Sequence, residues 1–225
     1  MDTTTVRSGT TTGGPTAGSR ARWGAGGLAV AGVALAVYPA LRPYPDSGPA
    51  WASQAWTAAH LLAIAGFVLL TAGVGAVWSS VRDTRAERTA FAALLTTGAG
   101  VGLTLPYYGA EVFGLHTIGE WSVRGGDPGL LAMADDLHYA LPAVLTFAVG
   151  LLGIAAGAVL TAVALARSGR FPAWSGVPLA LGFAFYIPQY FGPAWLRIAH
   201  GLLVAGGCLW VWRSLRAPRA DTGRR

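Results

Sequence analysis

The chain has 225 residues, of which 53% are hydrophobic and only 12% are charged. Ordinary soluble domains carry about 25% charged residues, so this composition excludes a disordered chain and argues against a soluble globular protein. The net charge of +6 comes from 16 basic residues, all of them arginine, against 10 acidic residues. A single cysteine excludes an intramolecular disulfide framework.

Six apolar stretches reach or approach the length of about 20 residues that a helix needs to cross a bilayer core. The fifth and sixth stretches are short and marked by prolines. The predicted spans are residues 23–41, 56–78, 89–113, 139–166, 174–191 and 195–212. Glycine and alanine recur inside them, and small residues let membrane helices approach closely. The sequence therefore predicts an all-α, polytopic membrane protein built as a six-helix transmembrane bundle.

The two ends of the chain differ from this middle part. Residues 1–22 are rich in Thr, Gly and Ser and predict a disordered cytoplasmic tail, and residues 213–225 predict a basic cytoplasmic tail. A cleaved signal peptide over residues 1–36 is the alternative, because residues 34–36 have the small-x-small form of a cleavage site. The apolar run continues past this point to Leu41, which favours an uncleaved first span.

The arginines predict the orientation. With the N-terminus inside, 13 of the 16 arginines fall on the inner side and only Arg42, Arg124 and Arg197 on the outer side. This distribution follows the positive-inside rule, so we expect a plasma-membrane protein with both termini in the cytoplasm. The basic tails are not interleaved with aromatic residues as a single-strand nucleic-acid site would be. The predicted partner is the lipid bilayer and not a nucleic acid, and the oligomeric state is left open.

A weak repeat accompanies the spans. Three spans end toward the outer side in proline and tyrosine, at Tyr38-Pro39, Pro106-Tyr107-Tyr108 and Pro188-Gln189-Tyr190. Each is followed by an outer loop and then by a helix with a histidine in or near its first turns. These histidines are His60, His138 and His200. The pattern is typical either of three repeated helix hairpins or of the aromatic belts found in any membrane protein.

The third span carries the most informative carboxylate. Its polar residues Thr97, Thr104, Tyr108 and Glu111 are spaced by 7, 4 and 3 positions, which places them along one helical face. A polar stripe on a membrane helix is expected to face the bundle interior, where its groups find partners. An ionisable group inside a span is a candidate functional residue, so Glu111 is the first candidate acid or base.

The other candidates lie toward the same outer side and could line one cavity if the bundle closes. The candidate catalytic residues are Glu111 and Asp135; the candidate ligand-binding residues are Tyr108, Gln189, Tyr190 and Arg197; the candidate metal ligands are His60, His138 and His200. A structural alternative exists for each: Glu111 could pair with Arg197, and a lone histidine could hydrogen-bond to nearby backbone.

Several functions fit this pattern. Three histidines and a carboxylate suit Zn²⁺ or a similar ion, whereas haem is disfavoured because all histidines lie on one side. A membrane-embedded enzyme acting on a lipid or isoprenoid would use Glu111 or Asp135 as acid or base, in the manner of terpene cyclases. A structural or accessory subunit of a membrane complex or transporter needs nothing further. We therefore predict a membrane protein of undetermined activity whose outer-leaflet polar pocket binds a small or lipidic ligand or a metal.

Two segments also suggest a relationship. Residues 105–116, LPYYGAEVFGLH, and residues 177–183, VPLALGF, resemble those of small multi-span membrane proteins found in high-GC actinobacteria. The resemblance covers most of the chain after residue 23. That group has no established activity, so the resemblance implies a multi-span membrane fold and transfers no site residue to this chain.

Overall fold

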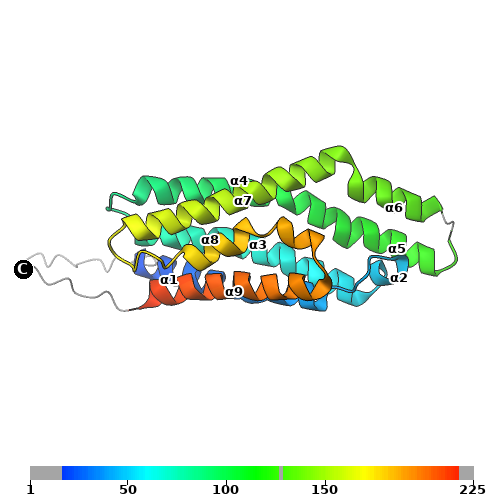
Figure 1. Ribbon diagram of the computed structural model, residues 1–225, viewed down its shortest axis with the longest axis horizontal. Coiled ribbons are helices and arrows are strands. Elements are labelled where there is room, and N and C mark those ends of the chain that lie inside the picture. Colours follow the sequence, from blue (N-terminus) through cyan, green and yellow to red (C-terminus); the bar gives the residue numbers. More distant parts are fainter. Residues whose placement is uncertain (1–16, 127–128, 218–225) are drawn as a thin grey trace, which may run out of the picture.

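The computed structural model describes residues 17–126 and 129–217, and every regular element in these ranges is a helix (Figure 1). The prediction of an all-α protein is confirmed. The elements in chain order are α1 (Ala17–Leu41), α2 (Gly48–Trp51), α3 (Gln54–Ser80), α4 (Glu87–Gly109), η1 (Ala110–Leu115), α5 (His116–Val123), α6 (Gly129–Tyr139), α7 (Leu141–Arg167), α8 (Val177–Ala184), η2 (Pro188–Phe191) and α9 (Ala194–Arg216).

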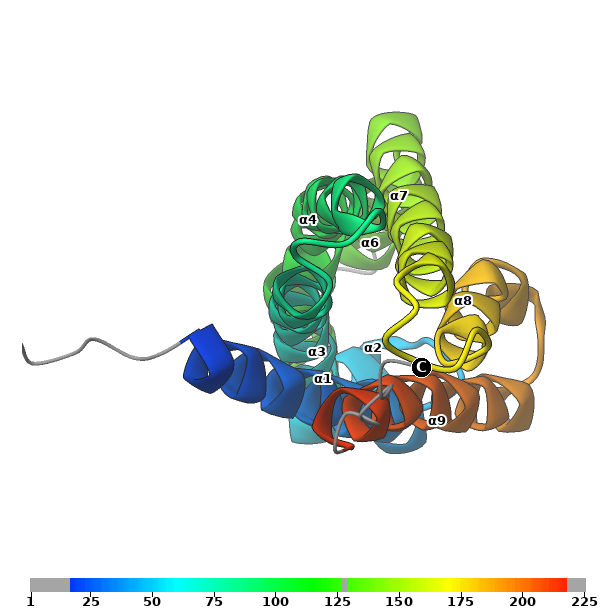
Figure 2. The same ribbon diagram turned by 90° about the vertical axis from the view of Figure 1, so that its left-hand side faces the viewer.

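A closed ring of helices surrounds the long axis of the molecule (Figure 2). Helix α1 packs against α3, α3 against α4, α4 against α7, α7 against α8, α8 against α9, and α9 returns to α1. The centre of the ring is filled by buried apolar and aromatic side chains, among them Leu28, Phe67, Tyr108, Ile154 and Phe183. Side chains directed inward from different helices therefore share one interior.

Within the described ranges, five helices are long and apolar enough to cross a membrane. They cover residues 23–41, 54–80, 87–123, 141–167 and 194–216. The chain-neighbouring pairs α1–α3, α4–α7 and α8–α9 pack side by side, as helix hairpins would. The internal repeat of these hairpins stays a prediction.

The expected fifth span, residues 174–191, is not one continuous helix. Its α-helical part, α8, has eight residues, or roughly 12 Å at 1.5 Å per residue, and a turn separates it from the 3-10 helix η2. Pro188 opens η2; proline lacks an amide proton, so it cannot donate the hydrogen bond that would continue α8. The two prolines that marked this stretch in the sequence, Pro178 and Pro188, thus lie in the first turns of two short helices.

The tails also differ from expectation. Residues 1–16 and 218–225 lie outside the described residues, so most of both predicted tails cannot be compared. Helix α1 already begins at Ala17, inside the segment that we expected to be a disordered tail, and α9 continues into the basic tail as far as Arg216. The first residue of α1 and the last residue of α9 lie at the same end of the bundle (Figure 1).

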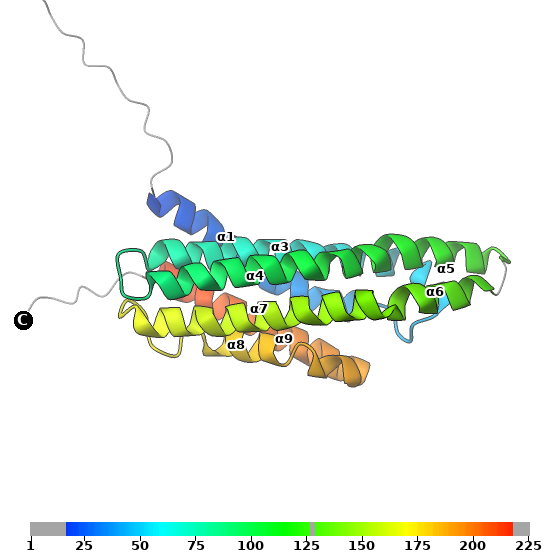
Figure 3. The ribbon, with the colours of Figure 1, turned by 90° about the horizontal axis from the view of Figure 1, so that it is seen from above.

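The opposite end is extended by one long helical run. Elements α4, η1 and α5 form a continuous run over Glu87–Val123, roughly 55 Å long at 1.5 Å per residue, whereas a bilayer core is about 30 Å thick. Helices α5 and α6 therefore reach beyond α1, α8 and α9 (Figure 3). The six residues of η1 form a π-helix, a local widening that often accompanies functional sites.

Candidate functional site

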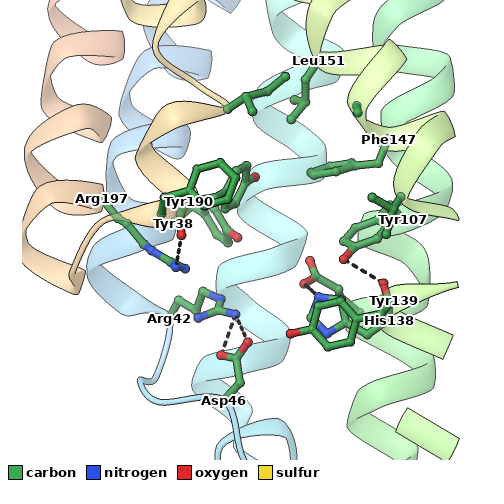
Figure 4. A pocket seen from close by; sticks show the side chains of 15 residues that line it. Tyr38, Arg42, Asp46, Tyr107, His138, Tyr139, Phe147, Leu151, Tyr190 and Arg197 are labelled. Carbon is green, nitrogen blue, oxygen red and sulfur yellow. Dashed lines mark hydrogen bonds and ion pairs between the residues drawn. The ribbon is translucent and has the colours of Figure 1, made fainter. Parts of the chain in front are cut away.

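A pocket of about 430 Å³ opens where the ring meets this extension (Figure 4). Its volume lies within the range of small-molecule sites, about 300–1,000 Å³. One part of the wall is charged or polar and the other is aromatic and aliphatic. The lining residues used below are Tyr38, Arg42, Asp46, Tyr107, Glu111, His138, Tyr139, Phe147, Ala148, Leu151, Ile187, Tyr190, Phe191 and Arg197.

Glu111 stands at the centre of the polar wall. The predicted stripe is confirmed, because Thr97, Thr104, Tyr108 and Glu111 are all buried. Glu111 belongs to η1, whose backbone is tied to α3: the indole nitrogen of Trp56 donates to the Glu111 carbonyl oxygen at 2.8 Å. The Glu111 carboxylate is therefore held at a fixed place on the pocket wall.

His60 approaches Glu111 from behind the pocket. The Nδ1 atom of His60 lies 2.7 Å from the carbonyl oxygen of Trp56, and because a carbonyl oxygen only accepts, Nδ1 carries the proton. The other ring nitrogen, Nε2, lies 3.2 Å from Glu111 Oε2 without another partner among the described residues. A neutral imidazole and a carboxylate would face each other with two lone pairs. A proton on one of the two groups removes this repulsion.

His138 reaches the same carboxylate from the other side. Its Nε2 atom lies 3.4 Å from Glu111 Oε1, and its ring packs edge-on against Tyr107 and stacks on Tyr139. The Tyr107 hydroxyl donates to the His138 backbone carbonyl at 3.1 Å, which joins the end of α6 to α4. Each carboxylate oxygen of Glu111 thus has an imidazole nitrogen within 3.4 Å.

Arg42 lies on the opposite side of the pocket, one residue after α1. Its Nη2 atom lies 2.7 and 2.8 Å from the two carboxylate oxygens of Asp46, and its guanidinium lies 4.6 Å from the ring centroid of Trp56. Burial lowers the pKa of the Arg42 guanidinium, but the Tyr38 hydroxyl and the Asp46 carboxylate raise it, and the net shift is upward. Arg42 therefore stays charged although it is buried.

Arg197 enters from α9 beside Arg42 (Figure 4). Its Nη2 atom donates to the Tyr190 carbonyl oxygen at 2.6 Å and its Nε atom to the Gly192 carbonyl oxygen at 3.3 Å. These bonds fix the side chain against η2 and the turn after it. No carboxylate of the described residues lies within ion-pair distance of Arg197, so the Glu111–Arg197 pair considered as an alternative is not formed.

A cluster of tyrosines forms the inner boundary of the pocket. The Tyr108 hydroxyl lies 3.2 Å from the Tyr190 hydroxyl and 3.5 Å from the Tyr186 hydroxyl, and its ring contacts those of Tyr38 and His60. Tyr108 and His60 have no exposed surface. Both residues support the pocket from within the ring and do not line it.

The structure does not bring every predicted site residue to this pocket. Glu111, His138, Tyr190 and Arg197 line it. Gln189 and His200 line a separate hollow of about 310 Å³ between η2 and α9, and the His200 Nε2 atom donates to the Gly182 carbonyl oxygen. Asp135 is exposed on α6 and is not among the lining residues.

The positions of Asp135 and His138 have a simple cause. We expected both residues at the start of the fourth span, but they belong to α6, which ends before α7 begins. On α6, Ala134 and His138 are four residues apart and share the inward face, whereas Asp135 lies outside that face. Asp135 is therefore not positioned to act on a ligand in this pocket.

Sequence reasoning missed Arg42, Asp46 and Phe147. A signal for Arg42 existed, because it is one of three arginines on the outer side that the positive-inside rule does not require. Its role depends on the turn that follows α1, which returns Asp46 to the guanidinium. Phe147 carried no signal, since an aromatic residue in a membrane span is ordinary.

No group of three or more His, Cys, Asp or Glu side chains in the described part of the chain is arranged to hold a metal ion. The predicted trio of ligands is divided, because His200 bonds to the backbone elsewhere. No protein-family model, no curated protein and no solved structure matches this chain.

Proposed function

We propose that the chain is a multi-pass protein of the plasma membrane with both termini in the cytoplasm. In this proposal the chain crosses the bilayer six times, and the run through α8 and η2 makes the fifth crossing. Three features support it: five helices suit a bilayer, both described ends lie at one end of the bundle, and the loops and helix termini at that end carry Arg82, Arg85, Arg88, Arg167 and Arg170. The pocket then lies at the outer leaflet.

We propose further that this pocket binds a small amphipathic or lipidic molecule. The observation that carries this proposal is the division of the pocket wall. Arg42, Arg197 and Glu111 offer charged contacts, while Phe147, Leu151, Ile187 and other residues offer apolar surface. Such a mixture matches the usual ligand site, in which apolar walls supply affinity and a few polar groups fix the orientation.

The direct test is to find the molecule. The full-length protein, purified in nanodiscs, would be examined by native mass spectrometry and its extract by lipid analysis. We expect a molecule that stays bound to the wild-type protein through purification and is absent from Ala148→Trp, because the indole would fill the pocket from α7. Val149→Trp is the matched control, since Val149 is the next residue, is exposed and does not line the pocket. Equal occupancy in the two variants would contradict the proposal.

A membrane-embedded enzyme acting on a lipid or isoprenoid is the second candidate. The observation that favours it is the buried Glu111 carboxylate between two imidazoles on the pocket wall. If Glu111 gives a proton to the ligand or takes one from it, the extracted molecule will change mass or isomer composition when it is incubated with the wild-type protein. The Glu111→Gln variant will bind the molecule but will not convert it. An accessory subunit, the third candidate, predicts no bound molecule in either measurement.

A further inference from the structure

One buried nitrogen in the pocket lacks the partner that burial demands. Arg42 is 7% exposed, and its Nη1 atom has no hydrogen-bond partner among the described residues. A buried charged donor without a partner is costly. Asp46 bonds only to the Nη2 atom of Arg42, so the Nη1 atom stays free to donate to an acceptor.

The second guanidinium increases the positive charge at this place. Arg42 has a counter-ion in Asp46, whereas the described partners of Arg197 are two backbone carbonyls and the rings of Tyr44 and Tyr190. These partners carry no net charge. The arginine side of the pocket therefore keeps an excess of about one positive charge when Asp46 is counted against Arg42.

The opposite wall does not neutralise this excess by direct contact. The Glu111 carboxylate lies 3.2 Å from His60 and 3.4 Å from His138, and no arginine of the described residues lies within ion-pair distance of it. The two guanidinium groups point into the pocket, one from the residue after α1 and one from α9 (Figure 4). A guanidinium binds carboxylate and phosphate oxygens through paired hydrogen bonds, so an oxyanion fits between the arginines better than a cation or a neutral group.

The apolar side of the pocket begins beside the arginines. Phe147 and Leu151 continue the wall along α7, and Ile187 continues it in the turn before η2. Phe191 and Tyr139 stand at the rim and are 88% and 66% exposed, on the side of the ring between α7 and η2. An apolar chain attached to the oxyanion could therefore leave the pocket toward the bilayer across these aromatic side chains.

From these contacts we infer that Arg42 and Arg197 form a subsite for the oxyanion head, phosphate or carboxylate, of an amphipathic anion. This inference rests on the proposed ligand-binding function and specifies the chemical class of the ligand. The head accepts hydrogen bonds from Arg42 Nη1 and from the Arg197 guanidinium. The tail lies against Phe147 and Leu151.

The test uses full-length protein in phosphatidylcholine nanodiscs and probes of defined charge. Dodecyl phosphate, dodecanoate and dodecyltrimethylammonium carry alkyl tails of nearly equal length, and inorganic phosphate has no tail. We expect the two anionic amphiphiles to bind roughly tenfold or more tightly than the cation, since a hydrogen bond to a charged group accounts for about that factor. Inorganic phosphate should bind more weakly than dodecyl phosphate. Competition by phosphatidylglycerol would identify a bilayer lipid as the source of the head group; without competition the source is a free single-chain anion.

The two proposals fail in different ways. Equal binding of the anionic and cationic amphiphiles would overturn the anion subsite and leave amphiphile binding intact. Equal binding of inorganic phosphate and dodecyl phosphate would leave the subsite and contradict an amphipathic ligand. If no amphiphile bound to the wild-type protein or to Ala148→Trp, both proposals would be overturned.

Variants separate the subsite from general damage to the fold. Arg42→Gln and Arg197→Gln should each weaken dodecyl phosphate binding roughly tenfold, because each removes a charged donor. Arg124→Gln is the control, since Arg124 lies at the same end of the bundle but is exposed and pairs with Glu120. Asp46→Asn should strengthen anion binding, because it removes the charge that competes for Arg42. Weaker binding in Asp46→Asn, or no effect of either arginine variant, would overturn the subsite.

Discussion

Two stretches of the interface between α4 and α7 are built from opposite kinds of residue. In the middle of the bundle the helices meet at Gly100 and Gly153, where a Cβ atom placed on Gly100 would lie 2.7 Å from the Gly150 carbonyl oxygen. Toward the pocket the same helices meet at Tyr107 and Phe147, whose rings stack with centroids 4.2 Å apart.

The difference shows how the pocket arises. Small residues allow membrane helices to pack backbone against backbone, so the glycine stretch closes the ring. The stacked rings of Tyr107 and Phe147 occupy space between α4 and α7, and the first turns of α7 lie farther from α9 than its later turns do (Figure 2). The pocket is the room that this divergence leaves between α7 and η2. The pocket therefore depends on both stretches, the glycine contacts that hold α4 and α7 together and the aromatic rings that fill the space nearer the pocket.

The largest effect is expected from a side chain added to the tight stretch. Gly100→Leu would force a branched side chain against the Gly150 carbonyl oxygen and the Ile154 backbone nitrogen. Neither of these backbone atoms can move without shifting α7. We expect the free energy of unfolding in detergent to fall by about 3 kcal/mol. Gly102→Leu is the matched control, because nothing lies within 4 Å of a Cβ at Gly102. A similar loss in both variants would mean that α4 and α7 are not closely packed at Gly100.

An intermediate effect is expected at the polar wall of the pocket. Glu111→Ala leaves His60 Nε2 buried without the carboxylate it faces, and it leaves His138 with one partner fewer. Stability in detergent should fall by about 2 kcal/mol, within the range for an unsatisfied buried polar group. Glu120→Ala removes a half-exposed carboxylate from the same helical run and should change stability by less than about 0.5 kcal/mol. A Glu111→Ala variant as stable as Glu120→Ala would show that the imidazoles do not depend on this carboxylate.

The same comparison explains what the sequence could and could not predict. Periodicity placed Thr97, Thr104 and Glu111 on the buried face of their helix, because a stripe at helical spacing depends only on local geometry. Two residues whose positions depend on a turn, Arg42 and Asp46, were missed, and His138 was expected at the start of the fourth span instead of on α6. The turn after α1 brings Asp46 back to Arg42, and the break between α6 and α7 directs His138 inward. No periodic pattern encodes these turns.

The fifth span shows a further limit. Its apolar residues and prolines fit either a short membrane helix or two helical pieces, and only the packing of α8 and η2 against α9 decides between them. The π-helix that carries Glu111 is likewise invisible in the pattern, since one widened turn shifts the face of every later residue. The sequence predicted Glu111 and the outer histidines as candidate site residues. The fold determines which of those histidines lie close to Glu111.

The smallest effect is expected from the bond that fixes the π-helix to α3. Trp56→Phe keeps an aromatic ring beside His60 and Arg42 but removes the indole N–H that donates to the Glu111 carbonyl oxygen at 2.8 Å. Because this carbonyl is buried, we expect a loss of about 1 kcal/mol in the free energy of unfolding. Trp121→Phe, at an exposed tryptophan of the same extension, should change little. If the two variants lost the same stability, the position of Glu111 would be set by η1 alone, and the widened turn by itself would hold the carboxylate at the pocket wall.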